Sequence, residues 1–259
     1  MTTIAQARPS LTTNDAAVLQ ALFDAESSPS SGITVDSSLP SWPATVNISE
    51  ADLSTLRSQE TEIIHRLQAS ESPSQETIQE ALEALNSLLE RYPTYPSAYA
   101  NRAQTLRLLV DPKYNENPHE NTESIADDSL FTPQAAHLSS KIFADLGEAI
   151  TLATPASPAD PVSTVQARLL ADTHTHRGYL LLKAARVKKT RSDQETEPVG
   201  PERLRGLSAD QLEEMASRDF FFGGRYGNKV AQQLAVQTNP YAKMCGAIVK
   251  EAMRKEMEG

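Results

Sequence analysis

The chain has 259 residues, of which 39% are hydrophobic, enough to bury one core or one repeat array. Its formal net charge is −10, with 34 acidic and 24 basic side chains, so we expect no general affinity for nucleic acid or for anionic membranes. No apolar run reaches the roughly 18 residues that a membrane-spanning helix needs. The N-terminal residues contain no apolar segment of signal-peptide length. The single cysteine, Cys245, excludes an internal disulfide and is typical of a reducing compartment. These features predict a cytoplasmic or nuclear protein.

The first 48 residues are expected to contain one short helix and a linker. Residues 14–23 (NDAAVLQALF) place apolar side chains on one side behind an Asn or Asp cap, which predicts a short amphipathic helix. Residues 26–44 are rich in Ser, Pro and Gly and are interpreted as a linker that cannot build a core. Trp42 is interpreted as an anchor for this linker, with contact to a ligand as the alternative.

Residues 49–110 carry the clearest periodic pattern. Residues 49–69 are the expected first helix, opened by a cap at Ser49 and Asp52, and residues 76–92 are its antiparallel partner. Residues 93–96 then turn the chain into a helix at 97–110. On a 34-residue helix–turn–helix period, Pro93 closes the unit and the buried positions are held by Ala81, Leu85, Leu88, Tyr99, Ala103 and Leu106. This pattern is typical of a tetratricopeptide repeat.

Two polar insertions, at about 111–134 and 188–207, interrupt the later units. The first precedes a helix that starts at about residue 135 and ends in TPASPADP at 154–161. The third unit starts near Val162, and after the second insertion residues 208–222 supply its partner helix. The last expected helices are residues 228–237 and 241–257, of which the final one would cap the array.

We therefore predict an all-α protein, built as a tetratricopeptide-type α-solenoid of about three helix pairs with a C-terminal capping helix. The repeat domain would comprise residues 49–259, and residues 1–48 would precede it. Stacked helix pairs of this kind create a concave groove lined by the first helix of each pair. Such a groove is suited to an extended peptide or to a helix of a partner.

Four segments resemble one family. They are NDAAVLQALF at 14–23, PSAYANRAQTLRLL at 96–109, RDFFFGGRYGNKVAQQL at 218–234 and NPYAKMCGAIVKEAM at 239–253. These segments are similar to the small three-repeat proteins of the tetratricopeptide repeat protein thirty-six family, and the last of them is not a feature of such repeats in general. The resemblance covers most of the chain from residue 14 to the end.

The resemblance implies a binding protein. Members of that family are described as interacting with Hsp70, or as protecting an enzyme of tyrosine breakdown from turnover. A protein partner is therefore implied, either Hsp70 or a metabolic enzyme, together with a link to tyrosine metabolism. We favour a non-enzymatic adaptor that binds its partner through the groove. The alternative is an Hsp70-type co-chaperone that recognises an acidic C-terminal peptide.

Five residues are predicted to border the partner-binding groove. Chaperone-binding repeats hold a C-terminal carboxylate with Lys, Asn and Arg, because a carboxylate needs charge-assisted donors in a fixed geometry. Asn101 falls at the groove position of the clamp asparagine, and Arg102 follows it. His176 and Arg177 belong to the corresponding stretch of the third repeat, and Tyr99 lies at the edge. The clamp is at best partial, and the alternative for Asn101 is that it bridges adjacent helices.

The residues do not assemble an enzyme or a metal site. His174 and His176 are two residues apart, so on one helix they point to different faces and cannot chelate one metal ion. Cys245 lies on an apolar helix face and is interpreted as a core residue rather than a nucleophile. The GGRYG stretch at 223–227 follows a helix, not a strand, and is interpreted as a helix C-cap and turn. We expect no catalytic residue, cofactor or metal.

Overall fold

The computed structural model describes residues 33–111, 129–191, 200–239 and residue 254. These residues fold into helices joined by turns, with one isolated β-bridge between Val35 and Val162. The prediction of an all-α protein is therefore confirmed for the described part of the chain. The elements in order are η1 (Ala44–Val46), α2 (Glu50–Gln68), α3 (Gln75–Arg91), α4 (Pro96–Val110), η3 (Ser129–Phe131), α5 (Ala136–Ala153), α6 (Thr164–Arg191), α7 (Glu202–Arg205), α8 (Ala209–Arg225) and α9 (Lys229–Thr238).

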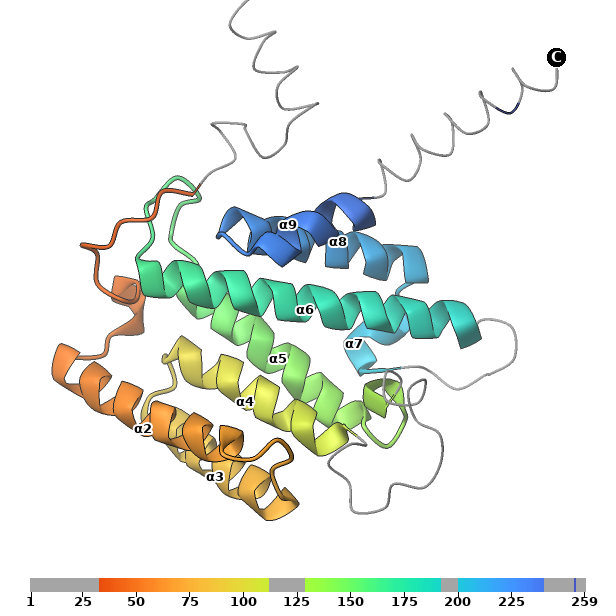
Figure 1. Ribbon diagram of the computed structural model, residues 1–259. Helices are drawn as coiled ribbons and strands as arrows, with labels where there is room; N and C mark the ends of the chain where they lie inside the picture. Colours follow the sequence, from red (N-terminus) through yellow and green to blue (C-terminus); the bar gives the residue numbers. More distant parts are fainter. Residues whose placement is uncertain (1–32, 112–128, 192–199, 240–253, 255–259) are drawn as a thin grey trace, which may run out of the picture.

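The helices form two layers. Each long helix packs on the next one along the chain, from α2 on α3 through to α8 on α9, with the short α7 set against α5. In Figure 1, α2, α4, α6 and α9 lie toward the viewer, and α3, α5 and α8 lie behind them. We call these the front layer and the back layer. Because α4 also contacts α6 directly, the front layer is continuous at its centre.

The helix starts are determined by local capping. The Ser49 hydroxyl accepts a hydrogen bond from the backbone N–H of Asp52 at 3.2 Å, at the start of α2. Ser208 and Gln211 form a capping box at the start of α8, with reciprocal bonds of 3.2 and 2.7 Å. Each cap satisfies N–H groups that the helix itself leaves unpaired. The helices α2 and α3 begin behind the capping serines Ser49 and Ser74, and α4 begins at Pro96, each within one residue of the position expected from the sequence.

Two clusters of buried apolar side chains hold the layers together. The larger cluster joins α3, α4, α5, α6 and α8, and the second lies at the N-terminal end of the molecule around Trp42, Tyr95 and Leu170. The crossing of α6 over α8 is close, because a Cβ at Gly178 would lie only 3.0 Å from the ring of Phe220. A larger residue at Gly178 would therefore force these two helices apart.

Residues 33–46 pack against the helical body, which differs from the linker expected there. Val35 pairs with Val162, where the N–H of Asp36 donates to the carbonyl of Val162 at 2.9 Å and the N–H of Val162 donates to Thr34 at 2.9 Å. Trp42 is only 7% exposed and lies edge-on to Tyr95, with ring centroids 6.1 Å apart. The anchor interpretation of Trp42 is therefore confirmed. Composition alone did not predict that this segment packs on the helices, because one large aromatic residue, Trp42, is enough to fix it there.

The two insertions meet where they join the helical body. Phe131, at the end of the first insertion, is fully buried, and its carbonyl accepts a hydrogen bond of 3.3 Å from Gly200. Gly200 has a φ of 79°, and a Cβ there would lie 3.2 Å from the Phe131 ring, so the contact requires glycine.

The second insertion also begins later than expected, since α6 continues to Arg191. Lys188, within that extension, donates to the carbonyl of Arg205 at 2.8 Å.

Some expected elements lie outside the described residues. These are the short helix at 14–23 and most of the final helix at 241–257, including Cys245. Within the described ranges, no helix combines the length and the apolar composition that crossing a bilayer demands.

The buried contact of Phe131 gives a first prediction. We expect Phe131→Ala to lower the free energy of unfolding by about 3–5 kcal/mol, because it empties a fully enclosed ring site. The matched control is Phe221→Ala, since Phe221 is 51% exposed and its loss leaves no cavity. Urea denaturation followed by circular dichroism measures both variants. Equal losses for the two would contradict the burial of Phe131.

Candidate functional site

Arg102 of α4 joins three helices. Its Nε and Nη2 donate to the two carboxylate oxygens of Asp145 on α5, at 2.8 and 2.7 Å. Its Nη1 donates to Oδ1 of Asn86 on α3 at 2.8 Å, and the guanidinium lies 5.4 Å from the centre of the Tyr99 ring. The side chains of Arg102 and Asp145 are only 12% and 5% exposed. Bidentate pairs of this kind have a fixed geometry, so Arg102 holds α3, α4 and α5 together.

Arg177 of α6 repeats this arrangement one helix pair later. Its Nε and Nη2 each donate to Asp219 on α8 at 2.7 Å, and His174 donates from Nδ1 to the same carboxylate at 2.8 Å. The His174 ring stacks on Tyr226 with centroids 6.1 Å apart. Burial opposes the ionisation of Asp219, but the hydrogen bonds and charges of Arg177 and His174 outweigh it and keep the pKa below its usual value.

The two arginines therefore occupy the same structural position. Each lies on a front-layer helix, and each is bound at two points by an aspartate of the following back-layer helix. Sequence analysis assigned both Arg102 and Arg177 to a groove for a partner. The structure directs them to the aspartates of the back layer instead, so the donors that a ligand carboxylate would need are already engaged.

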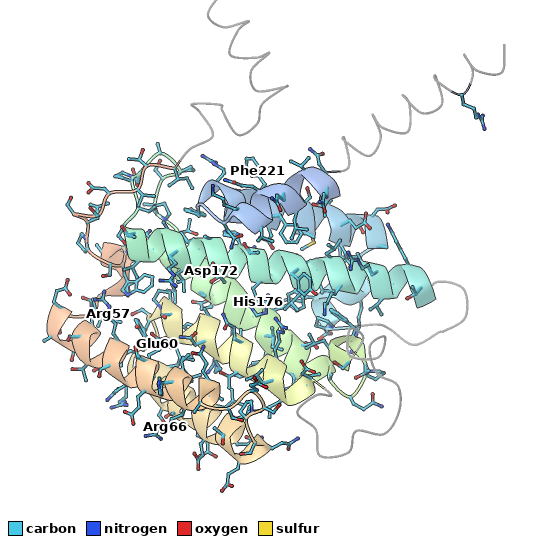
Figure 2. The ribbon with its side chains drawn as sticks, in the orientation of Figure 1. Arg57, Glu60, Arg66, Asp172, His176 and Phe221 are labelled. Carbon is cyan, nitrogen blue, oxygen red and sulfur yellow. The ribbon has the colours of Figure 1, made fainter. Side chains whose placement is uncertain are left out.

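Asn101 bridges two front-layer helices. Its side-chain amide donates to Oε1 of Glu60 on α2 at 2.6 Å, and the Tyr95 hydroxyl donates to the other oxygen at 2.8 Å. Burial raises the pKa of Glu60, although hydrogen bonds from neighbours that include Tyr95 and Asn101 oppose the shift. This geometry matches the bridging alternative for Asn101. Figure 2 places Glu60 on α2, on the side that faces α4.

Arg107 and His176 form the equivalent bridge between α4 and α6. Nη1 of Arg107 lies 3.0 Å from Nε2 of His176. Burial and the positive charge of Arg107 lower the pKa of His176 to about 4, so the ring is neutral at physiological pH and accepts the hydrogen bond. A third bridge joins α6 to the start of α9, where Asn228 donates to Asp172 at 3.4 Å.

The front layer is hollowed between α4, α6 and α9, beside the Arg107–His176 bridge. The cavity has a volume of about 520 Å³. Its lining residues on α4 and α6 follow the spacing i, i+3, i+4, i+7 that defines one face of a helix. They are Gln104, Arg107, Leu108 and Asp111 at the α4 side, and Asp172, Thr175, His176 and Tyr179 on α6. Asn228, Val230 and Leu234 close the cavity on the α9 side. Asp172 and His176 are labelled along α6 in Figure 2.

The hollow continues along the front layer toward α2. A second cavity of about 360 Å³ lies between the C-terminal halves of α2 and α4 and shares Gln104 and Leu108 with the first. The front layer therefore carries an extended depression across α2, α4, α6 and α9, which we call the front groove. It is the candidate functional site.

One of the five predicted site residues lines the larger cavity of this groove, namely His176. Asn101 lies between α2 and α4, and Tyr99 donates from its hydroxyl to the carbonyl of Pro93 at 3.0 Å. Arg177 borders a separate cavity of about 540 Å³ among α5, α6, α7 and α8. The structure thus separates the predicted residues into different sites.

Sequence analysis missed Arg107, Asp172 and Gln104. The spacing of polar residues along α4 and α6 was the available signal, because both helices repeat it in the same register relative to their first residues. Among the residues that the structure describes, no group of three or more His, Cys, Asp or Glu side chains could hold a metal ion.

The GGRYG stretch ends α8 and turns at Gly227, whose φ is 106°, so the C-cap interpretation is confirmed.

The fold and this site define a class: an all-α protein of stacked helices with a polar groove on one layer. No protein-family model matches the chain, and no solved structure matches it. It is 60% identical over 260 residues to the L-tyrosine degradation gene cluster protein hmgX of Aspergillus fumigatus, covering 100% of this chain and 98% of that protein. The chain belongs to the hmgX family. The name of this relative agrees with the link to tyrosine metabolism expected from the sequence.

The Arg102–Asp145 pair gives a second prediction. We expect Asp145→Ala to cost about 3–5 kcal/mol of stability, because it leaves the Arg102 guanidinium buried without its partner. The double variant Arg102→Met with Asp145→Leu should recover most of that loss, since it removes both charges together. Thermal and urea unfolding measure the effect. A double variant as unstable as the single one would contradict this account of the pair.

His176 gives a third prediction, about pH. Its folded pKa of about 4 lies below the unfolded value of 6.5, so the unfolded chain binds more protons between these values. The contribution of His176 to stability is therefore present above about pH 6.5 and is lost as the pH falls toward 4. We expect His176→Gln to reduce the loss of stability in that window, as followed by urea denaturation at several pH values. His65→Gln, at an exposed position of α2, serves as the control for the His-to-Gln substitution itself.

Proposed function

We propose that the chain is a non-enzymatic adaptor of the tetratricopeptide type that acts in tyrosine degradation by binding an enzyme of that pathway at its front groove. The observation that carries this proposal is the groove itself, which four front-layer helices line with polar and apolar side chains. Hollows of this kind suit a helix or an extended segment of a partner.

The helix pairs support the tetratricopeptide assignment. The helices α2, α3 and α4 contain 19, 17 and 15 residues and are joined by short turns, as the helix–turn–helix period requires. Ala98 and Ala103 are fully buried, and Gly178 permits the close approach of α6 to α8. Small residues at such crossings are what the repeat pattern demands.

The exposed apolar residues of the groove support binding of a protein. Val230 is 60% exposed, and Tyr179 is also more exposed than a core residue, yet both line the cavity. Apolar side chains beside polar ones are typical of the centre of an interface. The pathway is suggested by the relative, which is an L-tyrosine degradation gene cluster protein.

The co-chaperone alternative is less favoured by the geometry. A carboxylate clamp needs donors that are available in the groove, but Asn101 binds Glu60 and Arg102 binds Asp145 and Asn86. We therefore favour an enzyme partner over the C-terminal peptide of Hsp70.

Two exposed valines of α9 allow a matched test, which is the fourth prediction. Val230 lines the groove, whereas Val236 does not, and they are 60% and 62% exposed. We expect Val230→Glu to weaken binding to the partner enzyme at least tenfold, because a charge would be buried in the interface, and Val236→Glu to leave it unchanged. The enzymes of tyrosine breakdown from the same organism would be purified and titrated one by one, with affinity measured by interferometry.

The outcomes separate the candidate functions. Binding of one such enzyme that is lost only in Val230→Glu supports the adaptor. If none of the enzymes binds, or if both variants bind as tightly as the unaltered chain, the proposal is wrong. A labelled Hsp70 C-terminal peptide is titrated in parallel, and salt-sensitive micromolar binding would favour the co-chaperone instead.

A further inference from the structure

The cavity of the front groove contains a cation that lacks a carboxylate partner among the described residues. Arg107 is half-buried, and its side chain bonds to His176, which is neutral. A neutral imidazole does not compensate the charge of a guanidinium. By contrast, Arg102 and Arg177 each bind an aspartate at two points. Of these three arginines, Arg107 is therefore the one that retains its charge for a ligand of the cavity.

The cavity that Arg107 lines also contains acidic side chains. Asp172 lies one helical turn before His176 on α6, so the two side chains lie on one face, with Cβ atoms about 5–6 Å apart. Asp111 also lines the cavity, at the end of α4. The carboxylate of Asp172 would repel a simple anion that Arg107 attracts. A ligand that carries both charges close together would satisfy both signs.

The remaining lining combines apolar side chains with the polar side chains of Gln104, Thr175 and Asn228. Leu108 of α4 and Leu234 of α9 line the cavity together with the ring of Tyr179. The volume of about 520 Å³ lies within the range of roughly 300–1,000 Å³ that is typical of small-molecule sites. An apolar wall beside two opposite charges is the environment that an amino acid with a large apolar side chain requires.

We propose that this cavity binds a free α-amino acid with an aromatic or large apolar side chain. The ligand carboxylate binds Arg107, its ammonium group binds Asp172, and its side chain packs against Leu108, Tyr179 and Leu234. Arg107 bonds to His176, and Asp172 lies one helical turn from His176 on α6, so the two charged groups of an α-amino acid, which are attached to one carbon atom, face the same part of the cavity.

This site goes beyond partner binding and does not depend on it, although the two share the front groove. The aromatic amino acid to try first is L-tyrosine, because the relative belongs to an L-tyrosine degradation cluster. L-phenylalanine tests whether the phenolic hydroxyl is needed. Tyramine lacks the carboxylate, and N-acetyl-L-tyrosine lacks the ammonium group, so each removes one of the two charged contacts.

The experiment is isothermal titration of the full chain with these four compounds. We expect saturable one-to-one binding of L-tyrosine, and binding at least tenfold weaker for tyramine and for N-acetyl-L-tyrosine. Arg107→Gln, which keeps a donor for His176, should weaken L-tyrosine binding at least tenfold, and Asp172→Asn should do the same. Arg66→Gln is the control, because Arg66 is exposed on α2 outside this cavity.

The analogue series tests the site even if one variant fails to fold, which circular dichroism would reveal. The proposal is overturned if no amino acid gives saturable heat, or if N-acetyl-L-tyrosine binds as tightly as L-tyrosine. Binding that is unchanged in the folded Arg107→Gln and Asp172→Asn chains would also overturn it. Enzyme binding is measured separately on the Arg107→Gln chain. If the chain binds its enzyme but no amino acid, the amino-acid proposal is overturned and the adaptor proposal is not.

Discussion

Two buried pairs of guanidinium and carboxylate, Arg102 with Asp145 and Arg177 with Asp219, are the contacts on which the arrangement of the two layers depends. Charges removed from water are stable only when their geometry is well matched, and a bidentate pair permits little rotation or sliding. Each pair therefore sets how a front-layer helix lies against the back layer. The apolar packing around Phe220, between the same helices α6 and α8 that Arg177 and Asp219 join, is by itself less directional.

The orientation of these arginines also determines which side chains line the front groove. Because Arg102 and Arg177 are held by the back layer, the groove is lined by their neighbours along the same helices. On α4 these are Gln104, Arg107 and Leu108, and on α6 Asp172 and His176 are among them. The charges that join the layers and the charges that line the groove thus lie on two different faces of the same helices. The guanidinium of Arg107 remains in the groove because no aspartate of the described residues binds it.

The helices could be predicted from the sequence because their signals are local. Serine caps and the repeat period predicted α2, α3 and α4 to within one residue at their starts.

The site could be predicted only in part. Adjacent residues such as Asn101 and Arg102 differ by about 100° around a helix, and the repeat pattern did not distinguish which of them faces the groove. The contact of Phe131 with Gly200 joins two polar insertions across distant positions, and no local pattern encodes such a pairing.

The pairing of Val35 with Val162 affects how the stacked helices can unfold. In an open stack of repeats each unit touches only its neighbours, so the ends can fray independently. Here residues near the start of the described chain are hydrogen-bonded beside the start of α6, three helices beyond α3. Separating the first helix pair, α2 and α3, from the rest therefore also requires breaking the hydrogen bonds of Val162 with Thr34 and Asp36, beside the start of the third pair. Long-range closure of this kind favours cooperative unfolding, at the cost of slower folding than a purely local stack allows.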